Sequence, residues 1–214
     1  MEILEEGKYY HIFNRGINSE NIFKNDENRL YFLRLYKKHL EDSVSTFAYC
    51  LMSKHFHLVI RVHQENKKIT QSFSNFFNAY AKSINKTHNR TGSLFEKNFK
   101  RISIGSEIYL KNLILYVHFN PQVHFGINYR NYEFSSYQPI LKGDNTIIDI
   151  NAIMNIYDSP ENFKFLHENQ ELILEEKFKL EWFRCPIAVA VMWTIKKSFK
   201  PKPIIAKGMY CADL

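Results

Sequence analysis

Two histidines near the middle of the chain have the spacing of a metal half-site. His55 and His57 flank Phe56 in the apolar run HFHLVI. On a β-strand, side chains at i and i+2 leave the same face, so both imidazoles point together while Phe56 enters the core. Two neutral imidazoles side by side can hold part of the coordination shell of a divalent ion. Most such pairs on strands are structural, so this pair alone does not establish a metal site.

A tyrosine and an asparagine further along the chain could complete that site. Tyr116 and Asn120 are four residues apart in EIYLKNLILYVHFN, so they share one face of a predicted helix. The Asn120 amide oxygen is a hard ligand that suits Mg²⁺ or Mn²⁺ better than zinc. A tyrosine on an apolar helix is more often a core residue, so this half is also weak by itself.

Together the two halves predict phosphodiester transfer. A phenol has a pKa of about 10 and is a poor nucleophile at neutral pH. A metal on the scissile phosphate would offset the developing charge and favour the phenolate. The product would be a covalent phosphotyrosine, which retains the bond energy for rejoining. Tyr80 is the rival nucleophile, but its helical spacing from Phe73, Phe76 and Phe77 indicates packing in the core.

Hydrophobic periodicity and capping residues predict the elements that would position these groups. The predicted strands cover residues 8–15, 45–52, 55–62 and 95–104. The predicted helices run from Asn25 or Asp26 to about residue 40, over about residues 68–86, and from Ser106 to a stop at Pro121. This order predicts an α+β, ferredoxin-like fold, a split βαβ antiparallel sheet with helices on one face.

Positive charge is concentrated in one part of the chain. The 214 residues carry a formal net charge of +7, and residues 54–101 alone hold ten Lys or Arg and two Glu, a net of +8. Such a concentration suits a polyanion, although a solvated basic face without a ligand is about as common. The residues predicted to contact DNA are Asn14, Arg15, Arg90, Lys97, Lys100 and Arg101. His118 lies two residues from Tyr116, on a different helical face, and is interpreted as structural or solvent-facing. The other histidines weighed have no partner at useful spacing and are interpreted as structural: His11, His63, His88 and His124.

The remainder of the chain predicts an appendage and a cytoplasmic protein. Residues 1–140 are expected to form the main domain, residues 141–181 an acidic helical extension, and residues 182–214 a tail of unassigned role. Three scattered cysteines exclude a disulfide framework and a cysteine zinc site, and they favour a reducing compartment. The first residues lack the apolar segment of a signal peptide, and the longest apolar run, 187–193, is too short to span a bilayer.

Several motifs, taken together, resemble a known family. AYCLMSKHFHLVI resembles the His-hydrophobe-His metal strand of the HUH endonucleases. YYHIFNRG precedes it, and YAKSINKTHNRTGSLFEKNFK, EIYLKNLILYVHFNP and YEFSSY follow it. This order is similar to that of the REP-associated tyrosine transposases, a branch of the single-tyrosine transposases, over about residues 8–140. Ser53-Lys54 replaces the usual Pro-Asn, and GSLFEKNFK departs from the usual GHLFQGRFK, which alters a segment expected to contact DNA.

The resemblance implies both a reaction and the residues that perform it. His55, His57 and Asn120 would bind Mg²⁺ or Mn²⁺, and Tyr116 would form a 5′-phosphotyrosine link. The implied activity is that of a transposase that cuts and rejoins single-stranded DNA near hairpins. The implied setting is a bacterial cytoplasm at the nucleoid, with no membrane partner, and either a monomer or a homodimer.

Two other functions remain open at this point. A domesticated descendant would hold DNA or RNA hairpins without cutting them, although such a protein has no chemical need for all four residues. A metal-dependent hydrolase would use water as the nucleophile and would not need Tyr116.

Overall fold

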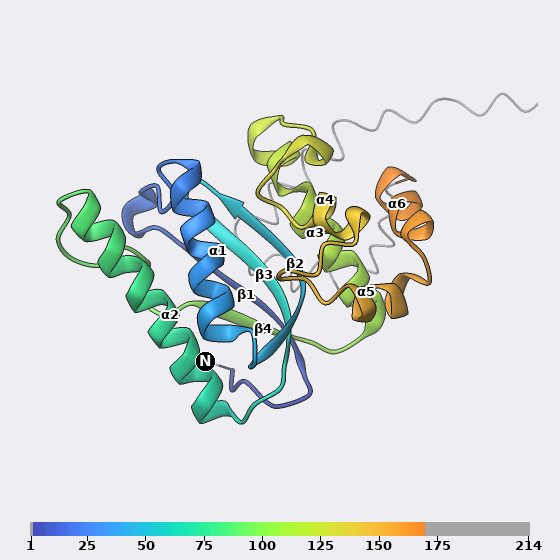
Figure 1. The fold of residues 1–214 in the computed structure, drawn as a ribbon, viewed down its shortest axis with the longest axis horizontal. Helices are drawn as coiled ribbons and strands as arrows, with labels where there is room; N and C mark the ends of the chain where they lie inside the picture. The colour runs from blue at the N-terminus through green and yellow to red at the C-terminus, as the bar shows by residue number, and fades with distance from the viewer. Residues whose placement is uncertain (1, 170–214) are drawn as a thin grey trace, which may run out of the picture. The chain divides into compact units, whose positions relative to one another are not determined.

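A four-stranded antiparallel sheet forms the centre of the protein, which is described by a computed structural model over residues 2–169. Its strands are β1 (Tyr9–Arg15), β2 (Val44–Met52), β3 (His55–Val62) and β4 (Lys100–Ile104). They lie in the order β2-β3-β1-β4, with every neighbouring pair antiparallel (Figure 1). Because β3 lies between β1 and β2, the sheet has the split βαβ arrangement that the sequence predicts.

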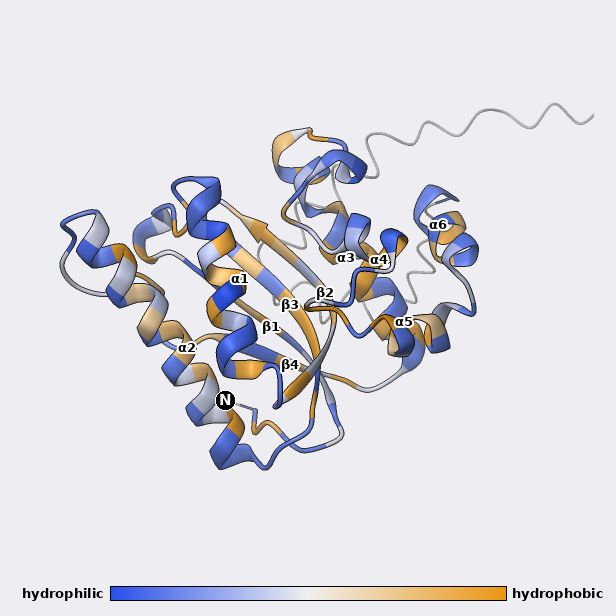
Figure 2. Ribbon diagram, viewed as in Figure 1, coloured by the Kyte–Doolittle hydropathy of each residue, from blue (hydrophilic) through white to orange (hydrophobic). Residues whose placement is uncertain are grey.

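Two helices cover one face of the sheet, α1 (Asp26–Leu40) and α2 (Asn66–Thr87) (Figure 1). The Asn25 side chain caps α1 by accepting a hydrogen bond of 3.0 Å from the backbone N–H of Asn28. Beneath the two helices, aromatic rings of Phe32, Phe76 and Tyr80 pack edge to face. In Figure 2 the strands are coloured as largely hydrophobic, whereas α1 contains many hydrophilic residues.

The opposite face of the sheet is covered by α3 (Glu107–Phe125). Ser106 caps this helix as predicted, because its side chain accepts from the N–H of Tyr109. The predicted stop at Pro121 is wrong, since the helix continues to Phe125 and ends at Gly126, whose φ of 68° favours glycine. Pro121 removes only the one N–H that would bond to the carbonyl of Val117.

The fourth strand is shorter than predicted. It begins at Lys100, whereas residues 95–99 form an irregular segment that has a single isolated backbone bridge to the sheet, between Gly16 and Phe95, among the described residues. Asn98 has a φ of 60°, a left-handed conformation that a regular strand does not contain. The propensity of Phe95 and Phe99 for strands is therefore overridden, and both rings instead pack against Phe77 on α2.

The chain after α3 lies against the free edge of β2. It contains a short 3₁₀ turn (Tyr129–Asn131) and the helices α4 (Tyr137–Lys142), α5 (Ile150–Tyr157) and α6 (Pro160–Asn169). Isolated bridges join Cys50 to Ser135 and Thr46 to Ile148. One compact unit contains all the described residues, including the described part of the predicted extension 141–181. The predicted tail 182–214 lies outside the described residues. No helix within residues 2–169 is both long enough and apolar enough to cross a membrane.

Two buried histidines connect α6 to α3. Nδ1 of His118 lies 2.8 Å from Nε2 of His167, and Nε2 of His118 lies 2.7 Å from the Ser136 hydroxyl. The other nitrogen of His167 lies 2.7 Å from the carbonyl oxygen of Phe163. Both rings are fully buried, and burial lowers the pKa of His167 to about 4. His118 is thus structural, one of the two roles that its sequence position indicates.

This pair makes the fold sensitive to acid. In the unfolded chain His167 takes up a proton near pH 6.5, whereas in the folded protein it stays neutral down to about pH 4. Its contribution to stability is therefore complete above pH 6.5 and declines as the pH falls towards 4. We expect the wild type to lose on the order of 2–3 kcal/mol more than His167→Gln over this interval. Urea unfolding at several pH values measures the difference, and parallel curves for the two proteins would contradict it.

Candidate metal and nucleophile site

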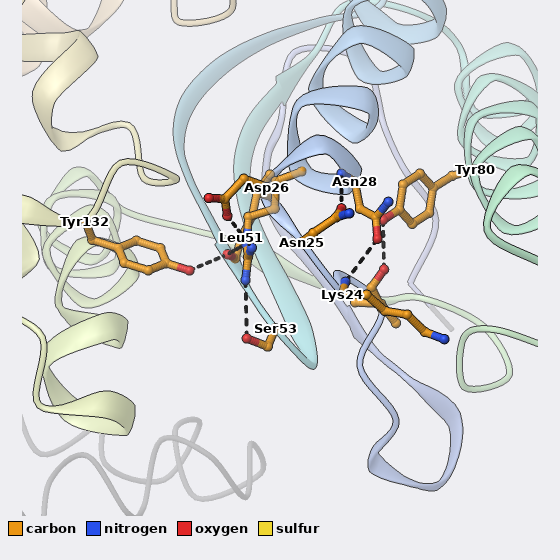
Figure 3. Close-up of polar contacts among 10 residues, drawn as sticks. Lys24, Asn25, Asp26, Asn28, Leu51, Ser53, Tyr80 and Tyr132 are labelled. Carbon is orange, nitrogen blue, oxygen red and sulfur yellow. Dashed lines mark hydrogen bonds and ion pairs between the residues drawn. The ribbon is translucent and has the colours of Figure 1, made fainter. Parts of the chain in front are cut away.

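A polar network anchors the turn that leads into the histidine strand. The guanidinium of Arg29 on α1 donates to the carbonyl oxygen of Leu51 (3.2 Å) and to the hydroxyl of Ser53 (3.2 Å). Tyr132 donates to the same Leu51 carbonyl at 2.7 Å (Figure 3). Ser53 lies in the turn between β2 and β3, so the position at which His55 enters the sheet is held from both sides.

Alternation along β3 separates the core residue from the imidazoles. Phe56 is fully buried and packs against Phe32 and Phe77 on the side of α1 and α2. His55 and His57 occupy the other face, with ring centroids 5.2 Å apart. The arrangement predicted for the H-F-H run is therefore present.

Helix α3 brings its two predicted residues to the same place. The ring of Tyr116 lies edge-on to that of His57, with centroids 5.6 Å apart. The Asn120 amide nitrogen donates to the carbonyl oxygen of Tyr116 at 2.8 Å, which leaves its oxygen directed elsewhere. Asn120 also lies close to His55: burial lowers the pKa of that imidazole, and the neighbouring Asn120 amide partly opposes the shift. The four residues singled out in the sequence thus meet between the sheet and α3.

The donor atoms at this point fit a divalent ion. Nε2 of His55, Nε2 of His57 and Oδ1 of Asn120 are buried and make no hydrogen bond with the described chain. Leaving a buried polar atom unpaired costs about 1–3 kcal/mol, so such a cluster is expected only where it has a function or binds a ligand. Within residues 2–169 no three His, Cys, Asp or Glu side chains are placed to hold an ion. An ion here would therefore need the amide oxygen of Asn120 as its third protein ligand.

Burial keeps these imidazoles neutral. It lowers the pKa of His55 to about 4, with a further lowering from His124, and it lowers the pKa of His57 well below its usual range. Only the neutral form of imidazole has a lone pair for a metal, so both rings are in the binding form at neutral pH. The same desolvation also disfavours any positive charge in the site when no anion lies beside it.

Two further histidines lie at the site, although their sequence positions predict structural roles. Nε2 of His11 on β1 lies 2.9 Å from Nδ1 of His57, and His124 on α3 has its ring centroid 5.4 Å from that of His55. The predicted sheet order could have identified His11, because it makes β1 the neighbour of β3. His124 was missed because the helix was expected to stop before it.

The site is closed in this conformation. The exposed fraction is 4% for Tyr116, 1% for Asn120 and 0% for His57. His55 and His124 are half-buried and form the edge nearest to solvent. A phosphodiester can reach the phenol only after the Tyr116 side chain or its surroundings move.

The residues predicted to contact DNA fall into two groups. Arg15 forms an ion pair with Glu96 and Arg90 forms one with Glu20, so their charges are already partly neutralised. Of the other four, Asn14, Lys97 and Arg101 line a groove, and Lys100 is exposed on the edge strand β4.

That groove, of about 540 Å³, lies between α2 and residues 92–101. The rings of Phe77, Phe95 and Phe99 line it, and the centroids of Phe77 and Phe99 are 5.2 Å apart. The guanidinium of Arg101 stacks on the Phe99 ring at 4.8 Å. Exposed Lys82 and Lys97 lie at the same groove. Aromatic rings beside cations are the features by which proteins hold single-stranded nucleic acid.

The remaining sequence candidates have structural surroundings. Tyr80, the rival nucleophile, is fully buried and donates to the carbonyl of Ile22 at 2.8 Å. His63 lies on the surface, 2.9 Å from the Ser45 hydroxyl. Neither residue lies near the donor cluster, and Tyr80 is a core residue as its spacing indicates.

Comparison with known proteins shows a similar fold in one solved structure. No protein-family model and no curated protein matches the sequence. Among solved structures, a REP-associated tyrosine transposase bound to a REP hairpin matches with a TM-score of 0.52 and 13% sequence identity. The match covers 70% of this chain and 87% of that one. The fold that the family resemblance implied is thereby confirmed.

Proposed function

We propose that this protein is a metal-dependent strand transferase that cuts and rejoins single-stranded DNA at hairpins. The observation that carries the proposal is the meeting of Tyr116 with three buried, unpaired ligand atoms from His55, His57 and Asn120. A fold shared with a hairpin-bound tyrosine transposase supports the same function. The ion proposed is Mg²⁺ or Mn²⁺, because the amide oxygen of Asn120 is a hard ligand that suits these ions better than zinc.

The proposed reaction is a displacement at phosphorus. The Tyr116 oxygen forms a bond to the scissile phosphorus, the bond to the 3′ oxygen breaks, and the phenolic proton leaves to solvent or to the departing oxygen. The result is a 5′-phosphotyrosine link and a free 3′ hydroxyl, which can attack the link to rejoin the strand. A bound ion would neutralise charge on the non-bridging oxygens. The imidazoles and the amide would hold the ion, and α3 sets the direction of the phenol.

The groove between α2 and residues 92–101 offers a path for the strand outside the reaction centre. Asn14 lines it, and the next residue, Arg15, is the register partner of His55. The groove therefore opens at the end of the sheet where the histidine strand begins. Phosphates would lie beside Lys82 and Lys97, and an unpaired base would stack on Phe99.

One observation favours a second candidate function. The buried position of Tyr116 suits a protein that keeps the ancestral pocket but binds hairpins without cutting them. The two candidates differ in the outcome of the following experiment.

A covalent adduct tests the nucleophile. Incubation of the protein with a single-stranded hairpin oligonucleotide and Mn²⁺ should give a protein–DNA adduct that survives denaturing electrophoresis. We expect Tyr116→Phe to abolish it, since the variant lacks the attacking oxygen. Tyr80→Phe is the matched control and should retain it. An adduct that persists in Tyr116→Phe rules out this nucleophile, and binding without any adduct in the wild type supports the silent hairpin binder.

Calorimetry tests the metal site. Titration of Mn²⁺ into the protein should show one site per chain, and Mn²⁺ should raise the melting temperature by mass action. We expect His55→Ala to lose most of both signals, because it removes one of the two nitrogen ligands. His63→Ala removes a surface imidazole and should bind as the wild type does. Equal binding by the two variants would place the ion elsewhere.

Salt dependence tests the groove. In the Tyr116→Phe background, Lys82→Ala and Lys97→Ala should each weaken oligonucleotide binding several-fold and reduce the slope of log K against log salt by about 1. Lys38→Ala removes the same charge from the exposed surface of α1, and Lys38 is not among the residues that line the groove. If it weakens binding equally, the attraction is diffuse and the groove is not the path.

A further inference from the structure

We propose that His11 is a positioning residue that sets the tautomer of His57 and so presents the His57 lone pair to the metal. The inference rests on the proposed function, because it concerns the same ion. His11 lies on β1, a strand that contributes no other residue to the ligand set.

The contact is close and enclosed. Nε2 of His11 lies 2.9 Å from Nδ1 of His57, and the two rings are nearly stacked, with centroids 5.1 Å apart and planes inclined by 22°. His57 is fully buried and His11 is 4% exposed, so water does not compete freely for these nitrogens. The register of β1 on β3 fixes the pair, since Phe13 is opposite His57 and His11 is diagonal to it on the same face.

Proton placement between the two rings decides whether His57 can bind a metal. A hydrogen bond between two ring nitrogens contains one proton, carried by one ring and accepted by the other. If His57 Nδ1 carries it, His57 Nε2 has a lone pair for the ion. If His11 Nε2 carries it, a neutral His57 has its own proton on Nε2, which blocks coordination. An acceptor at His11 Nε2 therefore selects the metal-binding tautomer, as carboxylates and carbonyls do behind other metal-bound histidines.

The free side of His57 agrees with this assignment. Its Nε2 is buried and makes no hydrogen bond with the described chain, whereas its Nδ1 has the His11 partner. His11 also touches the nucleophile, because its ring is edge-on to Tyr116 with centroids 6.3 Å apart. One side chain on β1 thus supports both the ligand and the phenol from behind.

Two measurements test the inference. Nitrogen-15 NMR of the metal-free wild type should show His57 protonated on Nδ1 and unprotonated on Nε2. Calorimetry with Mn²⁺ should show affinity about 10- to 100-fold weaker in His11→Phe, which fills the ring space without an acceptor. His11→Gln places an amide oxygen near the former Nε2 and should bind within about threefold of the wild type.

The control variant removes one histidine of a similar buried pair elsewhere in the fold. His167→Phe removes an equally buried imidazole that contacts another imidazole, at 2.8 Å, away from the donor cluster. It should leave Mn²⁺ affinity unchanged, so a general loss of stability cannot imitate the His11 effect. His57 protonated on Nε2 in the wild type, or Mn²⁺ affinity in His11→Phe equal to wild type, overturns the inference. If the wild type fails to bind Mn²⁺, the metal proposal falls, and the tautomer measurement decides the His11 contact by itself.

Discussion

The register of β3 between β1 and β2 is the constraint on which the candidate site depends. It places His57 opposite Phe13 on one side and Cys50 on the other, all on the face that α3 covers. A slip of one residue would turn both imidazoles towards α1 and α2 and bring Phe56 out of the core. The aromatic packing of Phe56 therefore secures the direction of the histidines, although it has no part in their chemistry.

The closed polar cluster has a cost that the rest of the domain offsets. Unpaired buried nitrogen and oxygen atoms lower stability, and proteins tolerate them mainly where function requires them. The opposite face of the same sheet has the contrary character, since Phe32, Phe56 and Tyr80 fill it with well-packed rings. The two faces of the sheet thus differ in character, with the aromatic core on the side of α1 and α2 and the donor cluster on the side of α3.

Much of this could be predicted from the sequence where local rules act alone. Alternation in the H-F-H run gave the facing imidazoles, and four-residue spacing gave the common face of Tyr116 and Asn120. The predictions failed where distant contacts override local preference. Pro121 does not end α3, because the helix before it is buried and the proline removes only one backbone N–H. Phe95 leaves the strand because its ring packs on Phe77. Local patterns gave no partner for His11, whose partner is 46 residues away, so its contact required the three-dimensional register.

The unbroken course of α3 through Pro121 has a mechanical consequence. Tyr116, Asn120 and His124 are spaced by four residues on one continuous rod that ends only at Gly126. If the whole of α3 tilted to uncover the Tyr116 phenol, the same movement would carry the Asn120 amide oxygen away from the imidazoles. Substrate entry by helix tilting would thus separate the proposed metal ligands from one another. Rotation of the phenol about its own side-chain bonds, on a stationary rod, keeps those ligands together.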